Sequence, residues 1–178
     1  GISLEKKWVV CSAGGGKDSE KLIHASIKIA KDFPHVFFDV IGGPKSNYEY
    51  NFKLTSYKDY ENLRLYKETS ALKYLHAAAD IVICHGGYNS LIETLQGHAN
   101  VICFPTQNKE NSEQFIHSHR LSQFSKITPV TNFLELRKTF EETLQKSPSA
   151  YAFKAKTSLD LKGTENIKNF VYNDLNIS

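Results

Sequence analysis

The segment HGGYNSLIE (85–93) places two glycines, two hydrogen-bonding side chains and a carboxylate directly after an apolar run. The glycines leave the backbone free of side chains, so that a ligand can approach it closely. Ser90 and Glu93 match the S-x-x-E capping box, in which two side chains satisfy amide groups at a helix start. Capping explains neither the glycines nor Asn89, which lies one turn before Glu93 on the same helix face. The segment therefore predicts a helix cap, a ligand site or both.

A second glycine-rich segment, SAGGGKDSEKL, contains Gly14, Gly15 and Gly16. It is not a phosphate-binding P-loop, because Cys11 stands where the first glycine of GxxxxGK[ST] belongs and Asp18 where the serine or threonine belongs. It also lacks the third glycine of the GxGxxG dinucleotide fingerprint, and no acidic residue ends the next strand. Three glycines can still bring amide groups close to an anion at a helix start. A strand-to-helix turn without a ligand is the alternative.

A third segment, FPTQNKENSEQF, follows a predicted strand and is rich in amides and carboxylates. Such a loop is normally only solvated, yet these groups also pair with several hydroxyls at once, as a sugar requires. The residues concerned are Gln107, Asn108, Glu110, Asn111, Glu113 and Gln114. Taken together, the three segments would suit a nucleotide diphosphate sugar.

The elements that position these segments alternate between short apolar runs and longer amphipathic stretches. This alternation predicts a doubly wound α/β fold, with a mainly parallel sheet covered by helices on both faces. In such sheets ligands bind at the carboxyl ends of the strands, where all three segments begin. We expect strands over 7–12, 35–42, 62–66, 80–85, 100–105 and 126–130. We expect helices over 18–33, 70–79, 89–97, 112–123 and 133–146, and a closing helix over about 161–174.

Composition narrows the class of protein. A chain of 178 residues with 40% hydrophobic and 23% charged residues predicts one soluble globular domain over 1–178. A net charge of +3 with scattered lysines does not favour nucleic acid as a partner. Lys6, Lys7 and Lys17 could contact anionic lipid, or they could simply be solvated. The three cysteines lie in apolar runs, which predicts buried reduced thiols, and the lack of a signal or membrane segment predicts a cytoplasmic protein.

The stretch ADIVICHGGYNSLIETLQGHANVICFPTQNKENSEQ resembles the donor-binding segment of GT-B glycosyltransferases. It is most similar to the glycosyltransferase family 28 carboxy-terminal type, the family that includes the N-acetylglucosaminyltransferase of peptidoglycan lipid II synthesis. It is also similar to the plant glucosyltransferase signature, which has HCGWNS, a following Glu, and a proline loop ending in Gln. The counterparts here are His85 to Ser90, Glu93, Pro105 and Gln114. The resemblance covers roughly Val9 to Leu121, with LKGTENIKNF near the end also of the family's kind.

The resemblance implies a set of donor-binding residues. Backbone amides would hold the diphosphate of the donor, and those residues are Gly14, Gly15, Gly16, Gly86, Gly87, Asn89 and Ser90. Glu93 would accept hydrogen bonds from the two ribose hydroxyls. Glu113 and Gln114 would read hydroxyls of the transferred sugar. Leu65 and Tyr66 match the stretch that holds uracil by backbone contacts.

The resemblance also implies an inverting, metal-independent hexosyl transfer with a UDP-hexose or UDP-N-acetylhexosamine as substrate and no cofactor. Helix dipoles and amides, rather than a metal, would neutralise the charge that develops on the leaving UDP. The sequence contains no DxD-like metal motif. His85 would add a proton or hydrogen bond to that phosphate, or it is a structural residue.

GT-B enzymes have two such domains, about 350 residues in all, and the acceptor site with its general base belongs to the amino-terminal one. Because the chain also lacks methionine, we expect an excised carboxy-terminal domain that is inactive by itself. A natural half-enzyme that pairs with a separate membrane-bound acceptor subunit, at the membrane surface, is the alternative. Two further alternatives are a UDP-sugar hydrolase or epimerase of the same fold, and a non-catalytic donor-binding subunit.

Overall fold

The computed structural model describes residues 6–14, 19–46, 60–95, 97–105, 112–123 and 126–146. Its strands form one parallel sheet in the order β3-β2-β1-β4-β5-β6. The strands are β1 (Trp8–Ser12), β2 (Phe37–Ile41), β3 (Leu63–Tyr66), β4 (Ile81–Cys84), β5 (Asn100–Cys103) and β6 (Ile127–Pro129). The helices are α1 (Ser19–Asp32), α3 (Leu72–Ala78), α4 (Tyr88–Thr94), α5 (Ser112–Ser122) and α6 (Phe133–Lys146). Each expected strand is present, so the predicted doubly wound α/β fold is confirmed.

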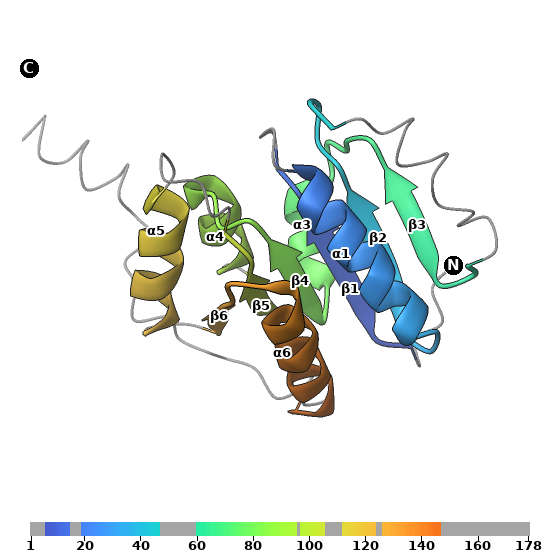
Figure 1. Cartoon of the computed structure of the whole chain (residues 1–178). Helices are drawn as coiled ribbons and strands as arrows, with labels where there is room; N and C mark the ends of the chain where they lie inside the picture. The colour runs from blue at the N-terminus through green and yellow to red at the C-terminus, as the bar shows by residue number, and fades with distance from the viewer. Residues whose placement is uncertain are drawn as a thin grey trace, which may run out of the picture.

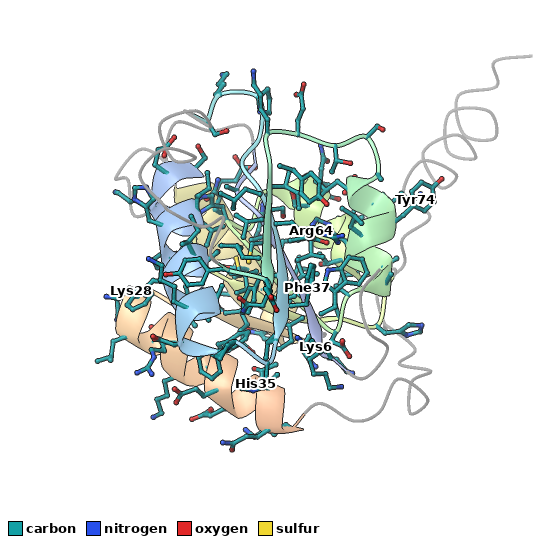
Figure 2. All side chains as sticks on the ribbon, turned by 90° about the vertical axis from the view of Figure 1, so that its right-hand side faces the viewer. Lys6, Lys28, His35, Phe37, Arg64 and Tyr74 are labelled. Carbon is teal, nitrogen blue, oxygen red and sulfur yellow. The ribbon has the colours of Figure 1, made fainter. Side chains whose placement is uncertain are left out.

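Helices cover both faces of the sheet, as the continuous apolar strands predict. Helices α1 and α6 pack on one face, while α3, α4 and α5 lie on the other (Figure 1). Neighbouring residues of β1 point to opposite faces, so Val9 joins the core under α1 and Val10 joins the core under α3 and α4. Figure 2 views the molecule from the β3 edge, with α1 and α6 on one side of the strand and α3 on the other. The closing helix expected near 161–174 lies outside the described residues.

A buried carboxylate ties three strands together on the α3 face. Asp39 of β2 is 1% exposed and accepts a hydrogen bond from Trp8 Nε1 at 2.9 Å. Arg64 of the edge strand β3 donates to both oxygens of the same carboxylate, from Nε and Nη2, at 2.7 Å each. The guanidinium lies 4.7 Å from the centre of the Phe37 ring (Figure 2). The charge of Asp39 is therefore compensated where it is removed from water.

Helix α6 begins with side chains that satisfy its first amide groups. Asn132 Oδ1 accepts a hydrogen bond from the Glu135 amide at 2.9 Å. Glu135 Oε2 in turn accepts from the Thr131 amide at 2.7 Å and from Thr131 Oγ1 at 2.8 Å. These hydrogen bonds lower the pKa of the Glu135 carboxyl. Asn132 is therefore the N-cap of α6, and the Glu135 carboxylate binds the preceding residue, Thr131, where a standard capping box would use the N-cap amide.

Candidate functional site

The candidate site is built where strands β1, β4 and β5 end. Ser12, Cys84 and Cys103 are the last residues of these strands and lie side by side in register. Two residues further on, Gly14 and Gly86 both adopt a left-handed backbone, with φ of 68° and 85°. A glycine adopts this conformation without the strain that a Cβ would add. The first two predicted glycine segments therefore emerge from neighbouring strands, although Gly15 and Gly16 lie outside the described residues.

Gly86 also packs against the third predicted segment. A Cβ built at this position would overlap Cys103 Sγ, and it would lie 3.4 Å from the Gln114 carbonyl oxygen and 3.8 Å from Ser118 Cβ. The chain turn after β4 thus packs directly on the first turns of α5. No such crowding exists at Gly87, where a Cβ would meet nothing within 4 Å. Gly86 is required for close packing, whereas Gly87 borders open space.

Helix α4 begins earlier than the sequence suggests, and the capping box expected there is wrong. The helix spans Tyr88–Thr94 with Gly87 at its N-cap, and no side chain caps it. Ser90 is therefore the third residue of the helix and cannot act as its N-cap. The cause is Gly87, whose carbonyl accepts the first helical hydrogen bond, from the Leu91 amide at 3.0 Å. A helix start leaves its first amides without intrahelical partners, and at α4 no side chain caps them.

Glu93 lies near an imidazole that sequence reasoning missed. Its side chain is 38% exposed, and Oε2 lies 3.9 Å from Nδ1 of His76 in α3. The ring of His76 is fully buried, and its Nε2 lies 3.0 Å from Ser12 Oγ at the end of β1. Burial lowers the pKa of His76 to about 4, so the ring is neutral at neutral pH. No sequence signal joins these residues, because His76 and Ser12 are 64 positions apart.

His85, the candidate acid or hydrogen-bond donor, is held by the backbone of the next strand connection. It is 8% exposed, and its Nδ1 lies 2.8 Å from the Phe104 carbonyl oxygen, which can only accept. The proton of the neutral ring at this contact is therefore on Nδ1. This bond fixes the ring orientation and links the turn after β4 to the end of β5.

The first turns of α5 bring the remaining polar candidates to the same edge. Glu113 has a side chain that is 70% exposed, and Oε1 lies 3.7 Å from His117 Nδ1 one turn later. The His117 ring contacts Tyr88 at the start of α4, with ring centroids 5.6 Å apart. Gln114 is half-buried and lies beside Gly86 through its carbonyl group. The structure therefore brings the backbone of Gln114 to the turn after β4, and Glu113 precedes it in the first turn of the same helix.

Leu65 and Tyr66 lie apart from these residues. They belong to β3, which is separated from β4 by β2 and β1. At about 4.8 Å per strand, that separation is roughly 14 Å. Their side chains pack against the two cores, and the Tyr66 carbonyl accepts a hydrogen bond from the Gly42 amide at 2.9 Å.

The three cysteines are buried free thiols, so the predicted reduced state is confirmed. Burial raises the pKa of Cys11 to about 12. Cys84 and Cys103 interact side by side, and this contact together with burial raises the pKa of Cys103.

Within the described ranges, no group of three or more His, Cys, Asp or Glu side chains is placed to hold a metal ion. Among the same residues, every helix is too short or too polar to cross a membrane.

Comparison with known proteins identifies relatives of this architecture. The model of the glycosyltransferase family 28 C-terminal domain matches residues 9–169. No curated protein matches the chain significantly in sequence. The crystal structure of Acinetobacter baumannii MurG is 17% identical, with a TM-score of 0.70, over 96% of this chain and 53% of that one. The spinosyn rhamnosyltransferase SpnG complexed with spinosyn aglycone is 14% identical, with a TM-score of 0.60, over 81% of this chain and 38% of that one.

A shorter solved chain has nearly the same extent as the present one. The solution structure of ALG13 is 11% identical, with a TM-score of 0.60, over 84% of this chain and 91% of that one. By contrast, the match covers about half of MurG and less than half of SpnG. These similarities establish the fold, and the family match establishes the kind of domain.

Proposed function

Because this chain belongs to the family of glycosyltransferase family 28 C-terminal domains, we propose that it binds the nucleotide-sugar donor of a glycosyl transfer. The donor is a UDP-hexose or a UDP-N-acetylhexosamine, and the transfer is inverting. The observation that carries the proposal is the packing of Gly86 against Gln114, which joins the glycine turn after β4 to the polar start of α5. A hexose attached to a diphosphate could contact both segments at once, with the diphosphate at the glycine turn and the hexose at the polar start of α5.

In this proposal, amides at the start of α4 and near Gly14 hold the diphosphate. The uncapped start at Gly87 supports this role, since amide groups there can donate to phosphate oxygens. As the glycosidic bond breaks, the same amides stabilise the negative charge on the leaving UDP without a metal. His85 already donates its Nδ1–H to the Phe104 carbonyl, so it donates to that phosphate from Nε2 when the ring carries a second proton.

In this proposal, two carboxylates bind the two sugars of the donor, the ribose and the transferred hexose. Glu93, with its half-exposed carboxylate, accepts hydrogen bonds from both ribose hydroxyls. Glu113, with its 70% exposed side chain, accepts from hydroxyls of the transferred hexose together with Gln114. The backbone near Leu65 and Tyr66 contacts the uracil.

Titration calorimetry with UDP, a UDP-sugar and NAD tests the proposal. Uridine nucleotides should bind and NAD should not. Glu93→Ala should weaken both UDP and the UDP-sugar by about tenfold or more, since hydrogen bonds to a charged group are lost. Glu113→Ala is the matched control, because it should weaken the UDP-sugar and leave UDP unchanged. If the wild-type chain shows no preference for the uridine nucleotides over NAD, or binds none of the three ligands, the proposal is overturned.

A second candidate is a donor-binding subunit that works with a separate acceptor-binding partner. It is favoured by the match to ALG13, which spans 91% of that shorter chain. Co-purification with a membrane-anchored partner, and transfer activity only in its presence, would support this arrangement. Release of free sugar from a UDP-sugar without any acceptor would instead indicate a hydrolase.

A further inference from the structure

Ser12, His76 and Glu93 form a line of polar groups from the end of β1 to the surface of α4. Ser12 is 3% exposed and His76 is 0% exposed, whereas the Glu93 side chain is 38% exposed. The imidazole lies between them, with Nε2 at 3.0 Å from Ser12 Oγ and Nδ1 at 3.9 Å from Glu93 Oε2. A buried ring therefore connects the sheet to the carboxylate that borders the site.

Nδ1 is the one ring nitrogen of His76 that has no hydrogen-bond partner among the described residues, and it is buried. A buried polar atom without a partner is costly, and most such atoms in proteins are paired. The Glu93 carboxylate, which can accept a hydrogen bond, lies 3.9 Å from Nδ1, and a movement of about 1 Å by this flexible side chain would reach hydrogen-bond distance.

The chemistry of the three groups determines the direction of both hydrogen bonds. An ionised carboxylate only accepts, so the proton between Glu93 and the ring must be on Nδ1. A neutral imidazole carries one proton, so Nε2 is then an acceptor and the Ser12 hydroxyl donates to it. Burial lowers the pKa of His76 to about 4, which keeps the ring neutral at neutral pH.

We propose that His76 is a positioning residue for Glu93. The Nδ1–H of His76 holds the Glu93 carboxylate in the orientation that accepts hydrogen bonds from both hydroxyls of a ribose. This inference rests on the proposed function, in which Glu93 reads the ribose of the donor. A carboxylate has about four lone-pair sites, so one bond to His76 leaves enough for two hydroxyls. Because His76 is fully buried and held by Ser12, it fixes one end of the carboxylate without contacting the nucleotide.

Two substitutions separate the two bonds of the ring. The amide of asparagine places an N–H close to the position of Nδ1, and that of glutamine places one close to Nε2. His76→Asn therefore keeps the donor toward Glu93 and gives up the contact with Ser12. His76→Gln keeps a contact with Ser12 and gives up the donor toward Glu93. A purely structural role for the ring predicts that both variants bind nucleotide alike.

The test compares the affinities of the full chain for UDP and for 2′,3′-dideoxy-UDP by titration calorimetry. The dissociation constant for 2′,3′-dideoxy-UDP divided by that for UDP measures how strongly the protein binds the ribose hydroxyls. We expect His76→Gln to lower this ratio by about tenfold, the effect of one hydrogen bond to a charged group. His76→Asn should keep the ratio within about threefold of wild type, and Glu93→Ala should bring it close to one.

The outcomes distinguish this inference from the proposed function. If Glu93→Ala abolishes the preference for UDP and His76→Gln retains it, the positioning role is wrong and the proposed function stands. If wild type binds both nucleotides equally or not at all, the ribose-reading role of Glu93 fails, and the inference fails with it. Imidazole nitrogen chemical shifts of the UDP complex provide a second readout that needs no variant to fold. An Nδ1–H tautomer of His76 supports the inference, and an Nε2–H tautomer overturns it.

Discussion

Acidification should destabilise this protein through His76. The ring is fully buried, and burial lowers its pKa from 6.5 to about 4. In the unfolded chain the same group has its ordinary pKa, so the unfolded state binds the proton more readily between pH 6.5 and 4. The contribution of His76 to stability is therefore complete above pH 6.5. It falls as the pH is lowered through 6.5 and levels off below about 4.

The magnitude follows from the difference between the two pKa values. One pKa unit corresponds to about 1.4 kcal/mol, so the full loss between pH 6.5 and 4 is about 3 kcal/mol. At pH 5 somewhat more than half of this loss has occurred. The free energy of unfolding should therefore fall by about 2 kcal/mol between pH 7 and pH 5 on account of His76 alone.

Urea denaturation of wild type and His76→Gln at pH 7 and pH 5 measures this loss. Other histidines and the carboxylates titrate in both proteins, so the informative quantity is the difference between the two pH dependences. Glutamine does not titrate, and the variant should lose about 2 kcal/mol less than wild type over this range. Parallel pH dependences, within about 0.5 kcal/mol, would refute the assignment of a neutral buried imidazole to His76.

Three further substitutions test the packing and the helix cap by chemical denaturation. Gly86→Ala should destabilise the fold by about 3 kcal/mol, because a Cβ would overlap Cys103 Sγ and φ is 85°. Arg64→Ala should cost about 3 kcal/mol, since it leaves the carboxylate of Asp39, 1% exposed, without its charge partner. Asn132→Ala should cost about 1 kcal/mol, because its side chain caps α6.

Each of these predictions has a matched control. Gly87→Ala should be nearly neutral, since a Cβ there meets nothing within 4 Å and φ is −58°. Arg137→Ala removes an arginine from a half-exposed pair with Asp32 and should cost less than about 1 kcal/mol. Asn132→Asp retains a capping oxygen and should retain stability. A control that destabilises as much as its test variant contradicts the stated cause.

The central strands were predictable because β1, β4 and β5 are short apolar runs that are buried on both sheet faces. β4, for example, is buried at all four positions, and its observed bounds lie within one residue of the expected ones. The expected capping box at Ser90 failed although its spacing was correct, because Gly87 starts the helix three residues earlier. The same kind of spacing at Asn132 does act as a cap. A local motif thus predicts a cap only when the helix start itself is known.

The candidate site was predictable in part for a related reason. Parallel strands must end at one edge, so the proximity of Gly86 and Gln114 follows from the strand assignments. The contact between His76 and Ser12 does not follow from them, because it depends on how α3 is turned over the sheet. Local spacing contains no information about that rotation.

The two outer strands of the sheet restrict how this protein can associate. β6 has only three residues. Val130, the next residue, donates its N–H to the Cys103 carbonyl of β5, so the backbone of Pro129 faces away from β5, and a proline offers no N–H on that side. β3 has four residues and carries the charged Arg64. Short strands, proline and charge all disfavour the addition of a foreign strand, which is how proteins avoid edge-to-edge aggregation. Association through these edges is therefore disfavoured, so a partner is expected to bind the helices or the strand-end loops.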